Sequence, residues 1–366
     1  MATQAEMAAM HHAIELAAGV IGTTNPNPAV GAVLLDPDGQ PVATGATRPV
    51  GGAHAEIVAL EAAGDRARGG TLVVTLEPCR HVGRTGPCTD AIVAAGVARV
   101  VYAVADPFAA AAGGGESLRT AGVDVEAGVL ADAATRDLEP WLVAVRRRRP
   151  HVTWKYAATL DGRTAAADGT SRWITSEASR RDVHRLRARS DAVVVGIGTV
   201  LADDTHLTVR DWPTSRQPLR VVVDGQARTP TSARILDGAA RTLVTVGEGA
   251  DTDRVKALRD TGAEVIELPR NHGRIELTAL LAALFEREQL IVLLEGGATL
   301  AGSFVQHRLV DCVVGYHAPA LLGAGPPVLG DAGIPTISAA MHLTVADVTA
   351  LGDDVRITAT VDRGGR

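Results

Sequence analysis

Four residues between positions 54 and 88 have the types and spacing that a hydrolytic metal centre requires. His54 and Glu56 form a His-x-Glu element, Cys79 follows a proline, and Cys88 comes after eight further residues. One imidazole and two thiolates can bind Zn²⁺ and leave its fourth tetrahedral position open to water, whose pKa the metal lowers toward about 7. Glu56 can reach that water without binding the metal. We therefore predict a zinc-dependent deaminase in which His54, Cys79 and Cys88 are ligands and Glu56 carries the proton.

A structural zinc site is the alternative for these residues. Such a site would normally have four protein ligands, and His81 is near enough in the sequence to be the fourth. The second cysteine also lies further from the first than in the Cys-x-x-Cys spacing of nucleobase deaminases. The His-Ala-Glu segment and the strand-Pro-Cys segment nevertheless favour catalysis, because they put both ligand groups where helices begin and thiolates are favoured.

The elements that would position these residues alternate between helix and strand. Apolar periodicity predicts a helix over 5–18, and a further helix follows His54 through about Ala63. Strands are expected at 29–35, 71–76 and 99–104, with a helix at about 88–95. This order predicts an α/β/α sandwich for the N-terminal half.

The second half of the chain begins again with a strand, after the run of four arginines at 146–149. We interpret that run as a solvated linker rather than a phosphate-binding patch, because it is short and Pro150 follows it. The expected domains are therefore 1–147 and 148–366. Strands are predicted at 151–157, 191–196, 219–224, 242–246, 264–268 and 290–295, with helices at about 177–189, 252–261 and 277–287. The pattern indicates a second α/β domain with a mostly parallel sheet.

Two features of the second half could do chemistry. A glycine-rich turn, Glu295 to Gly302, follows a strongly apolar strand, and such a turn lets backbone N–H groups approach a pyrophosphate; a plain tight turn would look the same. Lys155 is one of only two lysines in an arginine-biased chain. Its place on a strand favours a role in orienting substrate or a developing oxygen charge over a surface position.

Composition excludes several classes of function. The chain has 366 residues, with 46% hydrophobic and 21% charged residues and a net charge of −6, which indicates a two-domain globular enzyme without a basic field for nucleic acid. We expect no membrane span and no signal peptide, because no apolar run is long enough and residues 1–18 lack a basic start. Three cysteines do not make a disulfide framework, so a cytoplasmic location is expected.

Motifs along the whole chain resemble one family, the bifunctional deaminase/reductase of riboflavin biosynthesis. In the first half these motifs are Thr24-Asn25-Pro26-Asn27-Pro28, His54-Ala55-Glu56 and Thr75-Leu76-Glu77-Pro78-Cys79-x-His81-x-Gly83-Arg84-Thr85-x-Pro87-Cys88. In the second half they include Lys155-x-Ala157-x-x-Leu160-Asp161-Gly162-Arg163, Ser171-x-Trp173-Ile174-Thr175, Gly196-x-Gly198-Thr199 and Leu207-Thr208-Val209-Arg210. The motifs occur in the family's order and are specific in combination.

The resemblance implies a cytidine-deaminase-like sandwich followed by a dihydrofolate-reductase-like α/β domain that uses NADPH. Asn27, His81 and Arg84 would line the deaminase pocket, although Asn27 alone could be a turn residue. Substrate contacts in the reductase would come from Ser171, Arg187, Leu207, Arg210 and Glu295. NADPH contacts would come from Ala157, Trp173, Thr199, Asp203, Gly297, Ala298, Thr299, Leu300, Ala301, Gly302 and Ser303. The family's reductase domain usually pairs, so a homodimer or higher homo-oligomer is expected.

The chain departs from the family pattern at a few positions. Thr47 stands where a pocket histidine is usual, and Phe108 stands where asparagine is usual. These two changes leave open a paralogue that acts on a related pyrimidine in a specialised pathway. A nucleic-acid-editing deaminase is an alternative of another class, against which the acidic balance and the 3% aromatic content argue. The hypothesis remains a riboflavin-pathway enzyme that acts on a pyrimidine ribosyl phosphate with Zn²⁺ and NADPH.

Overall fold

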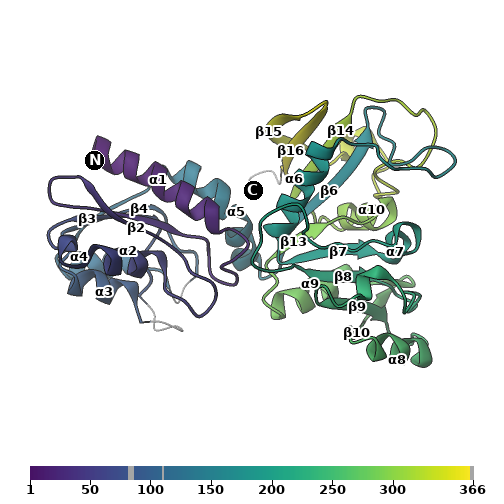
Figure 1. Cartoon of the computed structure of the whole chain (residues 1–366), viewed down its shortest axis with the longest axis horizontal. Coiled ribbons are helices and arrows are strands. Elements are labelled where there is room, and N and C mark those ends of the chain that lie inside the picture. The colour runs from purple at the N-terminus through teal and green to yellow at the C-terminus, as the bar shows by residue number, and fades with distance from the viewer. Residues whose placement is uncertain (81–85, 109–110, 363–366) are drawn as a thin grey trace. The chain divides into compact units, whose positions relative to one another are not determined.

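The computed structural model describes residues 1–80, 86–108 and 111–362, and it divides into two compact units (Figure 1). The first unit is Met1–Arg149 and the second is Pro150–Arg366. Each has its own sheet and its own buried apolar cluster. Among the helices that the described ranges contain, none is long and apolar enough to cross a membrane.

The first unit is built on a five-stranded sheet with the strand order β2-β1-β3-β4-β5. Its strands are β1 (Gly31–Leu35), β2 (Pro41–Ala46), β3 (Thr71–Leu76), β4 (Arg99–Val104) and β5 (Asp124–Ala127). Its helices are α1 (Gln4–Val20), α2 (Ala55–Ala63), α3 (Cys88–Ala94), α4 (Gly114–Thr120) and α5 (Ala131–Arg147), with a 3-10 turn at Gly64–Ala67. β3, β4 and β5 run parallel, whereas β1 is antiparallel to both of its neighbours.

Helices cover both faces of this sheet. α1 and α5 pack together on one face, while α2, α3 and α4 lie on the other (Figure 1). The central strands are mostly apolar and buried apart from the first residues of β3 and β4, as is typical of strands covered on both faces. The predicted α/β/α sandwich is therefore confirmed.

The second unit has a nine-stranded sheet with the order β10-β9-β8-β7-β13-β6-β14-β16-β15. Its strands are β6 (His151–Thr159), β7 (Ala192–Gly196), β8 (Leu219–Val223), β9 (Thr242–Gly247), β10 (Glu264–Leu268), β13 (Ile291–Leu294), β14 (Cys312–Ala318), β15 (Leu343–Leu351) and β16 (Asp354–Val361). A separate short ribbon pairs β11 (Arg270–Asn271) with β12 (Arg274–Ile275). The helices are α6 (Glu177–Ala188), α7 (Ile197–Asp203), α8 (Thr252–Asp260), α9 (Leu277–Glu286) and α10 (Ala298–Gln306), with 3-10 turns at Arg234–Leu236 and Ile337–Ala339.

The seven strands from β10 to β14 run parallel, and side chains alternate between two cores along them. In β7, Ala192 and Val194 face the cluster that α9 and α10 cover, whereas Val193 and Val195 face the cluster that α7 and α8 cover. Because all seven strands point the same way, their carboxyl ends lie along one edge of the sheet. In parallel α/β sheets, ligands bind at that edge.

Several features differ from the sequence-based expectations. The elements that were not predicted include β5, α4 and α5 in the first unit and β14 and α7 in the second. The C-terminal hairpin β15–β16, which extends the parallel sheet with antiparallel strands, was not predicted either. The arginine run is only partly a linker, because Arg146 and Arg147 form the last turn of α5, where basic side chains are favoured by the helix dipole. Arg148 then ends the helix in a left-handed conformation with φ 51°.

Candidate active sites in the two units

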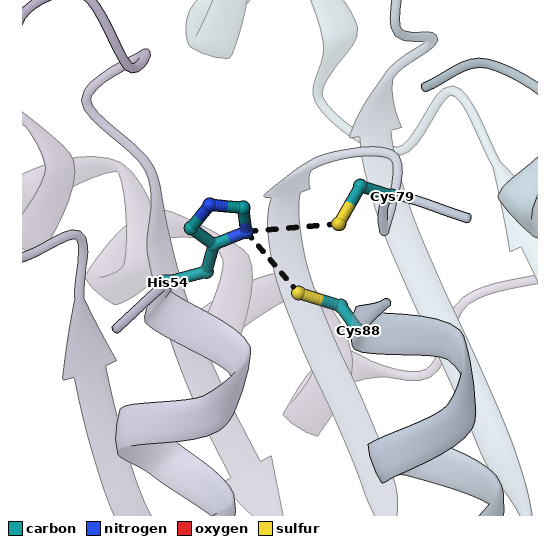
Figure 2. Close-up of side chains that lie close together, drawn as sticks. All are labelled: His54, Cys79 and Cys88. Atoms are coloured by element: carbon teal, nitrogen blue, oxygen red, sulfur yellow. Dashed lines mark hydrogen bonds between the residues drawn. The ribbon is translucent and has the colours of Figure 1, made fainter. Parts of the chain in front are cut away.

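The first site lies where α2 and α3 begin beside the end of β3 (Figure 2). His54 immediately precedes α2, Cys88 is the first residue of α3, and Cys79 follows β3. Nδ1 of His54 lies 3.3 Å from Sγ of Cys88 and 3.7 Å from Sγ of Cys79, and the three donor atoms all lie within 4.8 Å of one another. Tetrahedral zinc with ordinary bond lengths needs nitrogen and sulfur ligands about 3.6 Å apart. The donor set therefore fits Zn²⁺ in both chemistry and spacing.

Glu56 lies in the first turn of α2 with its side chain buried. Burial raises the pKa of this carboxyl group, and the nearby Cys79 acts in the same direction, while His54 and a hydrogen bond to Cys88 oppose the shift. For Cys79, hydrogen bonds from Cys88 and His54 lower the pKa of the thiol to about 4, against the effect of burial. A thiolate and a carboxyl group that can hold a proton are therefore next to each other.

A further carboxylate, which belongs to the Thr75-to-Cys88 motif but was given no role from the sequence, supports the strand end that carries Cys79. Oε1 of Glu77 accepts a hydrogen bond from the backbone N–H of Gly115 at 2.9 Å, and Oε2 accepts one from Asp106 at 3.2 Å. Glu77 thereby ties the end of β3 to the start of α4 and to the segment after β4. The available sequence signal was an acidic residue directly before Pro-Cys.

The other predicted pocket residues of this unit are not joined to the metal group by any contact that the described residues show. Asn27 closes a turn, with its backbone N–H bonded to the Thr24 carbonyl at 3.0 Å. Thr47 is buried, and its hydroxyl accepts a hydrogen bond from the Val30 N–H at 3.1 Å. His81 and Arg84 lie outside the described residues. The Thr47 hydroxyl is therefore hydrogen-bonded to the backbone directly before β1.

The second site is a buried charge cluster at the carboxyl edge of the nine-stranded sheet. Glu295, just beyond β13, accepts hydrogen bonds from Nε and Nη2 of Arg187 at 2.6 and 2.9 Å. Nζ of Lys155, on β6, lies 3.9 Å from the same carboxylate. The side chains of Glu295 and Arg187 are only 8% and 11% exposed. Residues 108 positions apart thus form a bidentate ion pair, with a third charge beside it.

The charged groups in this cluster shift one another's pKa values. Burial alone would raise the pKa of Glu295, but the charge and hydrogen bonds of Arg187, helped by Lys155, lower it to about 2. Burial lowers the pKa of Lys155, and Arg187 lowers it further, while Glu295 opposes both. The cluster therefore holds one carboxylate between two cations in a nearly dry environment.

The segment from Leu207 to Arg210 lies against this cluster. Nη1 of Arg187 donates to the Thr208 carbonyl at 3.1 Å, and Nη1 of Arg210 donates to the Thr208 hydroxyl at 3.1 Å. Leu207 is buried with φ +56°, a conformation that turns the chain sharply here. The structure therefore brings together Lys155, Arg187, Leu207, Arg210 and Glu295. No contact among the described residues joins Ser171 to them.

His184 belongs to the same cluster, although the sequence patterns did not single it out. Its Nδ1 accepts the backbone N–H of Arg210 at 3.3 Å, and burial and the neighbouring cations Arg187 and Arg210 lower its pKa. His184 lies three residues before Arg187 on α6, so both side chains lie on one face of that helix. That spacing was the available signal.

The residues predicted to contact a nucleotide lie along the same edge. Gly297 precedes α10, and a Cβ placed on it would lie 3.6 Å from the hydroxyl of Thr199 on α7. Ala298, Thr299, Leu300, Ala301, Gly302 and Ser303 form the first turns of α10. The N–H groups of a helix's first turn are available to phosphate oxygens. A glycine turn that keeps this approach clear therefore fits a pyrophosphate.

The remaining residues predicted to contact the nucleotide lie on β6, in the segment around Trp173 and at the end of α7. Ala157 lies on β6, two residues after Lys155. Trp173 is 70% exposed and stacks against the Arg180 guanidinium, which lies 4.4 Å from the ring centroid. The Asp203 carbonyl accepts a hydrogen bond from Arg172 at 3.2 Å, which ties the Trp173 segment to the end of α7.

The two units together define a two-domain enzyme, with a zinc-type deaminase site in one unit and a nucleotide-dependent reductase site in the other. Comparisons with known proteins agree for both units. The family described as "RibD C-terminal domain" matches residues 150–357, and the "Cytidine and deoxycytidylate deaminase zinc-binding region" matches residues 3–104.

Relatives match over nearly the full chain. The riboflavin biosynthesis protein RibD of Mycobacterium tuberculosis (strain H37Rv) is 46% identical over 354 residues, covering 96% of each chain. RibD of Escherichia coli (strain K12) is 39% identical, covering 94% of this chain and 96% of the relative. The solved structure of Acinetobacter baumannii RibD (form 1) superposes with a TM-score of 0.88 at 37% identity, covering 98% of this chain and 99% of that one.

The chain therefore belongs to the RibD family of riboflavin biosynthesis. It is a bifunctional enzyme that combines a zinc-dependent deaminase domain with an NADPH-dependent reductase domain. The family resemblance, the fold class and the two cofactors predicted from the sequence are confirmed. Neither the specialised paralogue nor the nucleic-acid-editing deaminase gains support from these matches.

Proposed function

We propose that the chain deaminates 2,5-diamino-6-(5-phosphoribosylamino)pyrimidin-4-one and then reduces the ribosyl group of the product to ribityl. The observation that carries this proposal is the presence of a zinc-type triad with a buried acid in one unit and a cation–carboxylate cluster beside a glycine turn in the other. A Thermotoga maritima structure, similar to this chain at a TM-score of 0.86 and 34% identity, bears the name diaminohydroxyphosphoribosylaminopyrimidine deaminase/5-amino-6-(5-phosphoribosylamino)uracil reductase. The proposed catalytic domains are residues 1–147 and 148–366.

In the deaminase unit, His54, Cys79 and Cys88 would hold Zn²⁺, which supplies a water activated for attack at neutral pH. The water oxygen would bond to the ring carbon while Glu56 takes one of its protons and passes it to the ring nitrogen. Glu56 would then carry the remaining hydroxyl proton to the amine, the carbon–nitrogen bond breaks, a carbonyl forms and ammonia leaves. The raised pKa of the buried Glu56 carboxyl group supports this role, because the group must be protonated and deprotonated in turn.

Pocket residues in the deaminase unit are proposed from the family motif. Asn27 would hydrogen-bond an edge of the pyrimidine, and Arg84 and His81 would hold the ribose phosphate side. The hydroxyl of Thr47 is bonded to the Val30 backbone, so we propose that this residue supports the sheet instead of contacting substrate.

In the reductase unit, NADPH would supply a hydride to C1 of the ribosyl group. The bond from C1 to the ring oxygen breaks, the bond from C1 to the amine nitrogen is kept, and the released oxygen takes up a proton. We place Lys155 next to that oxygen, where its ammonium group stabilises the developing charge and supplies the proton. Arg187 is committed to Glu295, so Arg210, whose described side-chain contact is to Thr208, is the arginine proposed for the 5-phosphate. Ser171 and Leu207 would complete the substrate contacts.

The nicotinamide must lie near Lys155 and Glu295 for this transfer. Ala157, two residues further along β6, is proposed to contact that ring, while Thr199 and Gly297 to Ser303 hold the pyrophosphate at the start of α10. Trp173 and Asp203 would border the cofactor from the Arg172 segment.

A homodimer or higher homo-oligomer through the reductase unit is also proposed. β15 is the edge strand of the nine-stranded sheet, and its side chains Val345 and Val348 are 59% and 61% exposed. An apolar edge strand is a surface on which a second chain can pair. Sedimentation of the full chain tests this proposal. A cytoplasmic location is supported by the three free cysteines, two of which are in the metal group.

Glu56→Gln in the full chain tests the deaminase proposal. The variant should retain zinc by elemental analysis and reduce the already deaminated substrate at the wild-type rate. Its deamination should fall by about 10²–10⁴-fold, the usual contribution of a positioned proton carrier. Full deamination in this variant, with zinc retained, would exclude Glu56 as the proton carrier.

A further inference from the structure

Glycines occur at the carboxyl ends of four neighbouring strands in the reductase sheet. Gly196 ends β7 and Gly247 ends β9, while Gly225 and Gly296 each lie two residues beyond the ends of β8 and β13. The strands are adjacent in the order β9-β8-β7-β13. Each of these four neighbouring strand ends therefore has one position that carries no side chain of its own.

The direction of a bound NADPH along this edge follows from the substrate cluster. Lys155 is on β6, on one side of β13, so a nicotinamide beside it would lie on that side of the turn at Gly297. The adenosine half would then extend the other way, over β7 toward β8. Gly225, which follows β8, lies two strands from the turn, or about 10 Å at about 4.8 Å per strand.

One arginine lies across this end of the edge. Arg270 is on β11, and its side chain crosses Gly247 so closely that a Cβ there would lie 2.0 Å from Nε. Its Nη2 donates to the Gly225 carbonyl. Gly247 does not have a positive φ, so this glycine is required for space and not for backbone conformation. The glycine at position 247 therefore leaves the space through which the Arg270 side chain passes.

The charge of Arg270 is not neutralised by the protein. Its Nε is buried without a hydrogen-bond partner, and it forms no ion pair with any acidic residue that the structure describes. By contrast, Arg287 pairs with Glu264 at 2.8 Å. A partly buried guanidinium without a carboxylate favours an external anion.

A second arginine comes from the same short ribbon. Arg274, on β12, donates from Nη1 to the hydroxyl of Ser303 at 3.3 Å, and Ser303 belongs to the proposed pyrophosphate segment. Like Arg270, it has no acidic partner within the described ranges. The β11–β12 ribbon therefore presents two cations between the adenosine end of the edge and the start of α10.

We propose that Arg270, assisted by Arg274, binds the 2′-phosphate of NADPH and so sets the preference for NADPH over NADH. This inference rests on the proposed reductase function. The 2′-phosphate carries close to two negative charges, and the fork of a guanidinium binds phosphate oxygens with two parallel hydrogen bonds. Arg270 makes the larger contribution, because it is less exposed than Arg274 and already held over the sheet edge.

Cofactor affinity of the full chain, measured by fluorescence titration, tests the proposal without relying on turnover. NADPH, NADH, 2′,5′-ADP and 5′-AMP are the four ligands. In Arg270→Gln, Kd should rise about 10–100-fold for NADPH and 2′,5′-ADP and stay within twofold for NADH and 5′-AMP. Arg274→Gln should raise the same two values about three- to fivefold, as an exposed charge does. Arg241→Gln, at the opposite edge of the sheet, is the matched control and should change none of them.

Gly247→Ala provides a test that keeps every charge. The added methyl group would displace the Arg270 side chain, so the preference for NADPH should fall although no arginine has been removed. Unchanged NADPH/NADH and 2′,5′-ADP/5′-AMP ratios in Arg270→Gln would overturn the proposal. An equal rise in Kd for all four ligands would also overturn the proposal. It would show that Arg270 only holds the Gly225 segment in place through its hydrogen bond to the Gly225 carbonyl. If the wild-type chain bound no NADPH, the reductase function itself would fail, which is a different result.

Discussion

Glu295→Gln is expected to destabilise the reductase unit by an amount that depends on pH. The carboxylate lies between Arg187, which binds it with two hydrogen bonds, and Lys155, at 3.9 Å. Glutamine keeps the size and one acceptor but removes the charge. The substitution therefore tests whether the ion pair, and not only the shape of the side chain, holds α6 against the end of β13.

The size of the effect follows from the pKa of Glu295, which is lowered from 4.5 to about 2. At about 1.4 kcal/mol per pKa unit, the folded state favours the charged form by about 3 kcal/mol. Because the folded pKa lies below the unfolded one, this stabilisation is fully present above pH 4.5 and is lost as the pH falls toward 2. Glu295→Gln should therefore cost about 3 kcal/mol at pH 7, and less below pH 4.5.

Hydrogen exchange during urea unfolding, read by mass spectrometry on peptides from β13 and α6, follows this unit within the full chain. Glu264→Gln is the control, because its pairs with Arg287 and Arg241 are partly exposed and should contribute less than about 1 kcal/mol. A loss below about 1 kcal/mol for Glu295→Gln at pH 7, or an equal loss at pH 3, would refute the reasoning.

Three further predictions concern the two sites. Removal of zinc with a chelator should abolish deamination and leave reduction of the deaminated substrate unchanged, because the metal group lies within Met1–Arg149; a parallel loss of both activities in rate assays would contradict this. Lys155→Gln should lower kcat for reduction by about 10²–10³-fold while Kd for NADPH stays within twofold, since the lysine acts on the reacting oxygen; a normal kcat would exclude that role. Thr47→Val should cost about 1–3 kcal/mol in the urea unfolding of the first unit, because it leaves the buried Val30 N–H without its side-chain partner, and zinc content should not change. Loss of zinc at unchanged stability would show that Thr47 belongs to the pocket.

The zinc group could be predicted from sequence because its members lie on short local segments. His54 precedes an apolar helix, and Cys79 follows an apolar strand, so their positions depend on neighbours within a few residues. Most of the buried parallel strands could also be predicted, since they are apolar runs, although β5 and β14 were not expected. Local patterns were thus enough for the fold class and for the metal site.

Contacts between distant segments could not be predicted in this way. Nothing in the types of Arg187 and Glu295 shows that they pair with each other, because the pairing depends on β13 lying beside β7 in the sheet. The β15–β16 hairpin was missed because β15 is an exposed edge strand whose polar and apolar residues lack the signal of a buried strand. The need for a glycine at position 247 likewise becomes clear only in the structure, where the Arg270 side chain crosses that position.

Product analysis with the diaminopyrimidine ribosylamine phosphate, with and without NADPH, tests the central claim most directly. Without NADPH the full chain should release one ammonia per substrate and accumulate the deaminated ribosyl compound. With NADPH it should convert that compound to the ribityl product and consume one NADPH for each. Reduction that precedes ammonia release, or a substrate that is left unchanged in both conditions, would contradict the account.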